Sequence, residues 1–232
     1  MEIKQIQLQA KSQTDKNRKV AYAITIVVML FTFLLGLTAE YIQLLSLMPM
    51  LWALIYPYFV ENAFLRLSRG ETFDSETFFV AEFGDHWKHY VKTSFFVNLS
   101  VTLWTFVFII PGFIKQIAYS MTPFVLYDNP NLTTRQIMDE SERIMKGNAG
   151  TFIKLYLSYF ILPILLNALL IVSGVYAFFL AWAGTNPGLV MILLGLFILS
   201  LTFNVLLTIL ITPRWHFAKV ALYEEIKNKE RA

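Results

Sequence analysis

The sequence predicts an all-α membrane protein, a polytopic transmembrane helical bundle with interfacial amphipathic helices. Apolar residue types make up 56% of the 232 residues and charged types only 15%, whereas a soluble domain carries about a quarter charged residues. Several apolar runs also approach about 20 residues, the length of a helix that crosses a hydrocarbon core about 30 Å thick. We therefore expect most of the chain to lie in a bilayer.

The first two apolar runs, 20–39 and 41–60, predict a helical hairpin that turns near Glu40. Residues 1–19 are polar and basic and lack the short apolar core of a signal peptide. We expect the first run to be a retained signal-anchor helix with its basic flank in the cytoplasm.

Four further runs follow at 91–110, 113–127, 152–182 and 189–211. Turn signals separate them at Pro111-Gly112, 128–131 and 184–188. Pro213 is expected to close the last run. The chain then forms a single membrane domain, 1–232, with a cytoplasmic N-terminal segment (1–19), a transmembrane bundle (20–212) and a charged cytoplasmic tail of helical spacing (213–232).

The run 113–127 decides the number of crossings. Its 15 residues would make a helix about 22 Å long, which could span, re-enter or lie at the interface. If it spans, both termini are cytoplasmic, and of 19 Lys and Arg residues only Lys115 faces outward, as an anchor near the interface. Because basic residues concentrate on the cytoplasmic side, this distribution favours six spans in the plasma membrane.

Residues 132–154 predict an amphipathic helix on the cytoplasmic side, capped by Thr133 or Thr134 and ended by Gly147 and Gly150. Its basic residues are candidate contacts for anionic lipid head groups: Arg135, Arg143, Lys146 and Lys154. The alternative is that these residues are only the ordinary positive-inside signal.

Few polar side chains interrupt the runs. We expect Glu40 and Glu61, at the ends of the second run, to reach water, and the alternative is a proton or cation site. Asn98, Asn167 and Asn204 lie within runs, where they could line an intramembrane polar path or bond to neighbouring helices.

The residues do not predict a metal, a cofactor or a catalytic centre. The chain has no cysteine. His86 and His89 could share one helix face with Glu82 and Asp85, but a zinc enzyme needs a third ligand and a general base at fixed geometry. We expect a wet interfacial helix there. Phosphate-binding glycine loops and nucleophile-elbow motifs are also missing from the sequence.

Several motifs occur in an order that resembles a bacterial membrane-protein family of unknown function, DUF975. They are FIIPGFIK at 108–115, YSMTPF at 119–124, DNPNL at 128–132, MKG at 145–147, LSYF at 157–160 and YEE at 223–225. The resemblance covers most of the chain. It implies a multi-span bacterial inner-membrane protein and no particular reaction.

The sequence thus favours a non-catalytic membrane component, a scaffold, accessory subunit or regulator. The alternatives are a small-solute or lipid transporter, to which the proline-broken runs are suited, and, less favoured, an intramembrane enzyme using Glu40, His86 or His89. The expected partners are the lipid bilayer and an unknown membrane protein, and no nucleic acid.

Overall fold

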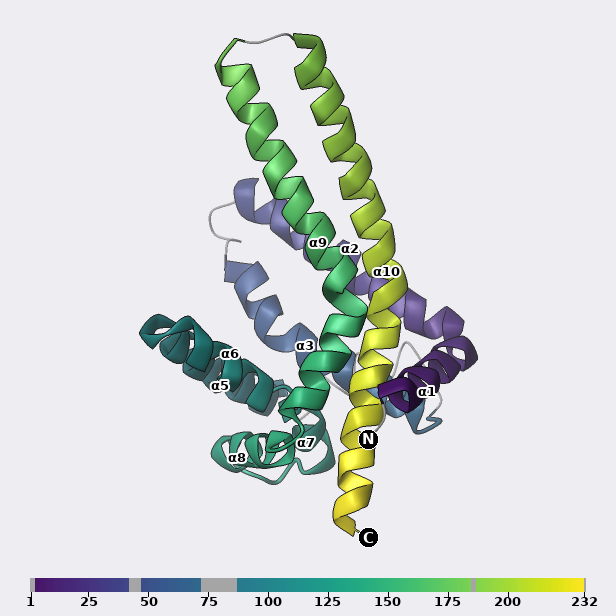
Figure 1. Ribbon diagram of the computed structural model, residues 1–232. Helices are drawn as coiled ribbons and strands as arrows, with labels where there is room; N and C mark the ends of the chain where they lie inside the picture. The colour runs from purple at the N-terminus through teal and green to yellow at the C-terminus, as the bar shows by residue number, and fades with distance from the viewer. Residues whose placement is uncertain (1–2, 42–46, 72–86, 185–186, 232) are drawn as a thin grey trace.

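The computed structural model describes residues 3–41, 47–71, 87–184 and 187–231, and the elements in these ranges are all helices (Figure 1). The all-α prediction is therefore confirmed for the described part of the chain. The helices are α1 (Ile3–Lys16), α2 (Arg18–Tyr41), α3 (Leu47–Ser68), α5 (Trp87–Val107), α6 (Ile109–Ala118), α7 (Thr122–Asp128), α8 (Thr134–Met145), α9 (Ala149–Trp182) and α10 (Pro187–Arg231).

The helices form three hairpins that leave a common base and return to it: α2 with α3, α5 with α6, and α9 with α10. The base consists of α1, α7, α8, the second half of α3 and the C-terminal part of α10. α1 packs along the C-terminal part of α10, so the two described ends of the chain lie on the same side of the molecule (Figure 1).

The hydrophobic core lies in the base. Its fully buried large side chains include Phe64 of α3, Phe124 of α7 and Phe217 of α10. α1 joins this core through one face, on which Ile6, Ala10 and Thr14 recur at helical spacing and are buried. Sequence analysis treated residues 1–19 only as a polar cytoplasmic segment and missed this helix.

The predicted amphipathic helix is confirmed as α8, but it ends at Met145, and Gly150 and Lys154 belong to α9. Thr133 is the N-cap of α8 and forms a capping box with Gln136, in which each side chain bonds the other residue's backbone N–H. The apolar face, with Ile137 and Ile144, is buried in the base. Gly147 follows with φ of +86°, the left-handed conformation that glycine adopts at low cost.

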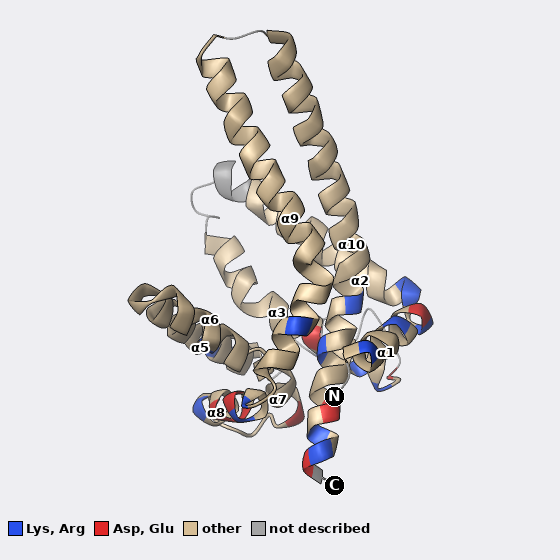
Figure 2. Ribbon diagram, in the orientation of Figure 1, with Lys and Arg blue, Asp and Glu red and all other residues tan. Residues whose placement is uncertain are grey.

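Three described helices contain segments long and apolar enough to cross a membrane: Arg18–Leu37, Ala149–Trp182 and Pro187–Glu230. The α9–α10 hairpin extends far beyond the base, and Lys, Arg, Asp and Glu gather at the opposite end of the molecule (Figure 2). Many apolar side chains along this hairpin are exposed, among them Ile171 and Leu199. A bilayer would cover them, so the chain has the features of a multi-pass membrane protein.

The run 113–127 does not form the single helix that the sequence predicts. It is divided between α6, which ends at Ala118, and α7, which begins at Thr122 with Pro123 in its first turn. Proline suits that position because the first N–H groups of a helix lack intrahelical partners. Three helices among the described residues are candidate spans, and six spans stay a prediction.

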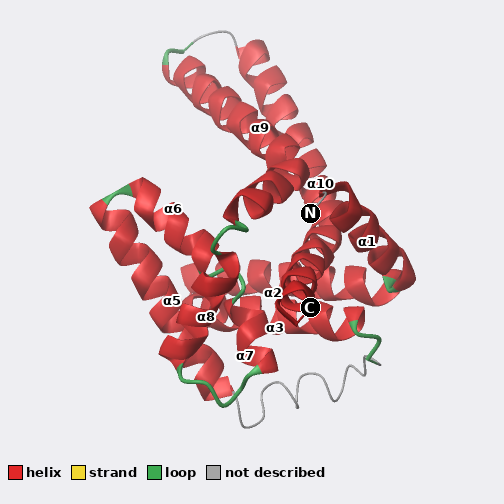
Figure 3. Cartoon of the chain, turned by 60° about the horizontal axis from the view of Figure 1, so that its bottom comes forward, coloured by secondary structure: helices red, strands yellow, loops and turns green. Residues whose placement is uncertain are grey.

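The turn of the α5–α6 hairpin lies at Phe108, not at Pro111-Gly112 as the sequence suggested (Figure 3). Gly112 instead allows the two helices to approach closely. A Cβ atom at Gly112 would lie 2.0 Å from the Thr105 Oγ1 atom, which is far inside van der Waals contact. Pro111 therefore lies in the first turn of α6, and Gly112 lets α6 pack closely against α5.

Pro213 does not end the last helix, and this prediction was wrong. α10 continues through it to Arg231, and many of the residues from Trp215 to Ile226, in the segment expected to be a charged tail, belong to the core. Proline in a helix interior costs about 3 kcal/mol. Burial of Trp215, Phe217 and Leu222 offsets this cost, at about 1.5–3 kcal/mol for each large apolar side chain.

Candidate functional site

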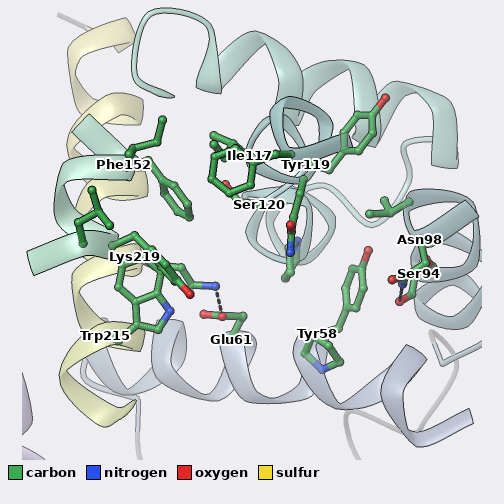
Figure 4. Close-up of a pocket in the computed structure, with 18 of the residues that line it drawn as sticks. Tyr58, Glu61, Ser94, Asn98, Ile117, Tyr119, Ser120, Phe152, Trp215 and Lys219 are labelled. Carbon is green, nitrogen blue, oxygen red and sulfur yellow. Dashed lines mark hydrogen bonds and ion pairs between the residues drawn. The ribbon is translucent and has the colours of Figure 1, made fainter. Parts of the chain in front are cut away.

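A cavity of about 560 Å³ lies where the three hairpins meet the base (Figure 4). We call it the junction pocket. It is lined by residues of α3, α5, α6, α7, α9 and α10 and of the Tyr119–Ser120 link: Pro57, Tyr58, Glu61, Ser94, Val97, Asn98, Phe113, Gln116, Ile117, Tyr119, Ser120, Pro123, Phe152, Ile153, Tyr156, Leu157, Ile164, Trp215 and Lys219. Its volume falls within the 300–1,000 Å³ that small-molecule sites span.

Glu61 is the acidic group of the junction pocket. Sequence analysis expected it to reach water, but α3 continues past it and its side chain is only 5% exposed. Its Oε1 atom pairs with the Lys219 ammonium and lies 3.0 Å from His216 Nδ1. A buried carboxylate needs such partners, because desolvation of an unpaired charge costs several kcal/mol.

Two oxygen atoms of the pocket lining lack hydrogen-bond partners among the described residues. They are Glu61 Oε2 and Ser120 Oγ, and both are shielded from solvent. Each can accept a hydrogen bond, and the Ser120 hydroxyl can also donate one. A polar group that entered the junction pocket could satisfy them.

An aromatic wall closes the α9–α10 side of the pocket. The Trp215 ring meets Phe152 and Tyr156 edge to face, at centroid distances of 5.5 and 5.4 Å. The Lys219 ammonium lies 5.7 Å from the Trp215 ring, within the range of a cation–π contact. These contacts hold Lys219 beside Glu61.

The exposed lining of the junction pocket combines large apolar side chains with the amides of Asn98 and Gln116. Phe113, Leu157 and Ile164 line the cavity and yet have exposed fractions of 50%, 43% and 42%. They come from α6 and α9. These exposed apolar side chains are suited to contact with a lipid chain.

A second charged cluster fixes α3, α7 and α10 to one another at the far side of the base. Arg69 Nη1 and Nη2 donate to the two carboxylate oxygens of Asp128 at 2.7 and 3.0 Å, and Nη2 also donates to Glu224. The Tyr223 hydroxyl donates to Asp128 Oδ2 at 2.8 Å, and Lys227 donates to the same atom.

The pKa values reflect this cluster. Burial alone would raise the pKa of Asp128, but the hydrogen bonds from Arg69, Lys227 and Tyr223 outweigh it and lower the pKa to about 2. The same bond to Asp128 raises the pKa of Arg69. Asp128 thus stays ionised and acts as the hub of a structural network.

The four predicted head-group contacts differ in exposure. Arg135 is 92% exposed, and its only described ion pair is a long one, 3.9 Å, to Asp139. Lys146 and Lys154 are also exposed. Arg143 is bound instead to Glu140 and to Glu230 of α10 at 2.6 and 2.8 Å.

Lys115 was expected to face outward as an anchor near the interface, and the structure places it against α8. Its Nζ atom donates to both carboxylate oxygens of Glu142 in α8, at 2.8 and 2.9 Å. The reason is that the α5–α6 turn lies at Phe108, so Lys115 is already on the returning helix and near the base.

Of the three amides considered for a polar path, Asn98 lines the junction pocket. Its side chain donates to the Ser94 carbonyl of its own helix at 2.8 Å. Asn167 donates to the Pro163 carbonyl at 2.8 Å, and Asn204 is buried in α10. Neither of these two belongs to the pocket lining, so a path through all three stays a prediction.

The candidate histidine site falls mostly outside the described residues, because His86, Glu82 and Asp85 lie in 72–86, and the side chain of Glu40 is not described either. His89 lies in the first turn of α5. Within the described ranges, no three His, Asp or Glu side chains are grouped so that they could hold a metal ion.

Sequence reasoning missed the pairing of Glu61 with α10. The residues are more than 150 positions apart, and the available signal was local: His216 and Lys219 are spaced i, i+3, on one helix face, among apolar residues. Two basic side chains on an apolar helix face indicate that a buried carboxylate lies opposite them.

No family model, no curated protein and no solved structure matches this chain.

Proposed function

We propose that this chain is a non-catalytic membrane component, a scaffold, accessory subunit or regulator whose polar base is a rigid platform beneath membrane hairpins. The supporting observation is that its charged side chains pair with one another between helices. Ion pairs join α3 to α7 and α10, α8 to α10, and α6 to α8 across long sequence separations. Such pairs fix the relative positions of the helices that carry them.

For the topology, we propose that the α2–α3 and α9–α10 hairpins cross the membrane and that the α5–α6 hairpin re-enters it. α6 has ten residues, about 15 Å of helix, which is half of the hydrocarbon core. The turn of this hairpin is apolar and exposed, with Phe108 and Ile109 at 69% and 79%. The turn can lie within the bilayer because the Phe108 N–H donates to the Trp104 carbonyl and the Phe108 carbonyl accepts from the Gly112 N–H, so both groups are satisfied within the hairpin.

This topology keeps the even number of crossings expected from the sequence and replaces six by four. Both described ends of the chain then face the same side. The basic residues of α1, α8 and the end of α10 favour the cytoplasm of the plasma membrane for that side (Figure 2).

Exposed cations of the base would meet anionic head groups. Arg135, Lys146 and Lys154 carry this role in our proposal, each contributing about 1 kcal/mol near a charged surface. Membership of the DUF975 family also remains part of the proposal, supported only by the motifs in the sequence.

Purification from native membranes in two mild detergents tests the proposed role. A scaffold or accessory subunit is expected to retain a partner protein at the same molar ratio in both detergents. A chain that runs alone in both detergents would argue against the role.

The junction pocket favours a second candidate, a small-solute or lipid transporter. Proline-broken helices border it, with Pro57 of α3 among its lining residues. Flux of solute or movement of labelled lipid in vesicles that contain only this protein would move this candidate ahead of the first.

A further inference from the structure

The junction pocket has two chemically different parts. Its rim includes exposed apolar side chains, Phe113, Leu157 and Ile164, together with the exposed amides of Asn98 and Gln116. Its interior brings together the hydroxyl and carboxylate groups of Tyr58, Glu61, Ser94 and Ser120. An amphipathic molecule with its tail at the rim and its head in the interior would match both parts.

The charges of the lining select among possible head groups. Glu61 and Lys219 are its acidic and basic side chains, and they are paired with each other. A cationic head would meet Lys219, and an anionic head would meet the buried Glu61 carboxylate. Since neither charge is left uncompensated, an uncharged head costs least to bring in.

The open hydrogen-bonding positions call for a donor. Glu61 Oε2 and Ser120 Oγ lack partners among the described residues, and an unsatisfied buried acceptor carries a penalty of about 1–3 kcal/mol. A hydroxyl group can donate to either oxygen while it accepts from the Gln116 amide.

We propose that the junction pocket binds an uncharged amphiphile that carries hydroxyl groups, of the chemical class of a monoacylglycerol. The acyl chain lies against the apolar side chains of the rim, and the glycerol hydroxyls reach Glu61 and Ser120. This inference goes beyond the proposed scaffold role and does not depend on it.

Photo-crosslinking in phosphatidylcholine nanodiscs tests the proposal. The probe is a monoacylglycerol with a diazirine in its acyl chain, and the labelled peptides are mapped by mass spectrometry. Four competitors have the same chain length and the same cis double bond and differ in the head: 1-monooleoylglycerol, methyl oleate, oleylamine and oleate. Only the first is uncharged and donates hydrogen bonds.

We expect labelling in peptides that contain residues 113–120 or 152–164. Monooleoylglycerol should compete about tenfold better than methyl oleate, because the ester lacks the donors. Equal competition by methyl oleate would overturn the proposal in favour of unspecific apolar binding. Stronger competition by oleylamine or oleate would contradict the proposal that the bound head group is uncharged.

Two variant pairs keep the test independent of folding defects. Leu157→Trp narrows the rim and should abolish labelling, whereas Leu165→Trp, an exposed α9 position outside the pocket lining, should not. Ser120→Ala should weaken monooleoylglycerol competition several-fold, and Ser173→Ala, whose hydroxyl bonds its own helix, should not. Equal labelling of both tryptophan variants would place the probe elsewhere and refute the site.

Discussion

Replacement of Asp128 by asparagine tests whether the charged cluster holds the base together. The carboxylate is 8% exposed and binds Arg69 through two parallel hydrogen bonds. An asparagine side chain would keep the shape but lose the charge that Arg69 and Lys227 face. Breaking such a pair leaves cations without their partner, so we expect clear destabilisation.

The pKa of Asp128 gives the size of the expected loss of stability. Its fall from 3.8 to about 2 in the folded protein corresponds to about 2 kcal/mol of stability at neutral pH, at 1.36 kcal/mol per pKa unit. Because the folded pKa is the lower one, this stability is present above pH 3.8 and is lost as the pH falls toward 2. The Asp128→Asn variant should lack that part of the acid dependence.

Unfolding in mixed micelles, followed by circular dichroism at pH 7 and at lower pH, measures both effects. The control is Asp139→Asn, whose carboxylate is 71% exposed and 3.9 Å from Arg135; it should change stability by less than about 0.5 kcal/mol. If the two variants are equally stable at pH 7, the cluster does not hold the base together and the reasoning fails.

Three further changes probe other features by the same unfolding assay. Gly112→Ala places a Cβ atom 2.0 Å from Thr105 Oγ1 and should lower the free energy of unfolding by about 1–3 kcal/mol. The control is Gly36→Ala, whose Cβ would meet nothing within 4 Å. Equal effects of the two variants would exclude close α5–α6 packing. Phe217→Ala, at a side chain that is 1% exposed, should lower the free energy of unfolding by about 3–5 kcal/mol, whereas Phe178→Ala on the exposed hairpin should change it little. The reverse order would contradict a hydrophobic core in the base. Thr133→Ala removes the capping box and should cost about 1 kcal/mol, with faster hydrogen exchange at the start of α8; unchanged exchange there would exclude the cap.

The sequence predicted local features well because their causes are local. Apolar runs near 20 residues predicted α2, α9 and the apolar half of α10. Thr133, the apolar spacing after it and Gly147 predicted α8 with its cap and its end. In each case the side chains and backbone preferences that set the structure lie within a few residues of it.

Features set by tertiary contacts were missed. Pro213 is a strong stop signal, but packing of Trp215 and Phe217 in the base keeps α10 continuous. Pro111-Gly112 resembles a turn, yet Gly112 is needed for contact with Thr105, a partner that periodicity does not reveal.

The candidate site was predicted only in part. Asn98 and the end-of-run position of Glu61 were noticed, but the pocket arises from six helices that meet only in the fold. Lys219 and His216 looked like part of a charged tail. Their role follows from α10 lying beside α3, which no local pattern indicates.

The central claim, that the hairpins rise from one cytoplasmic base, is tested most directly by cysteine accessibility in intact cells. The chain has no native cysteine, so single cysteines at 108, 131, 183 and 229 each report alone to an impermeant maleimide. We predict external labelling at 183 only, labelling at 131 and 229 only after permeabilisation, and none at 108 within the bilayer. External labelling at 131 or 229 would place the base outside the cell and contradict this account.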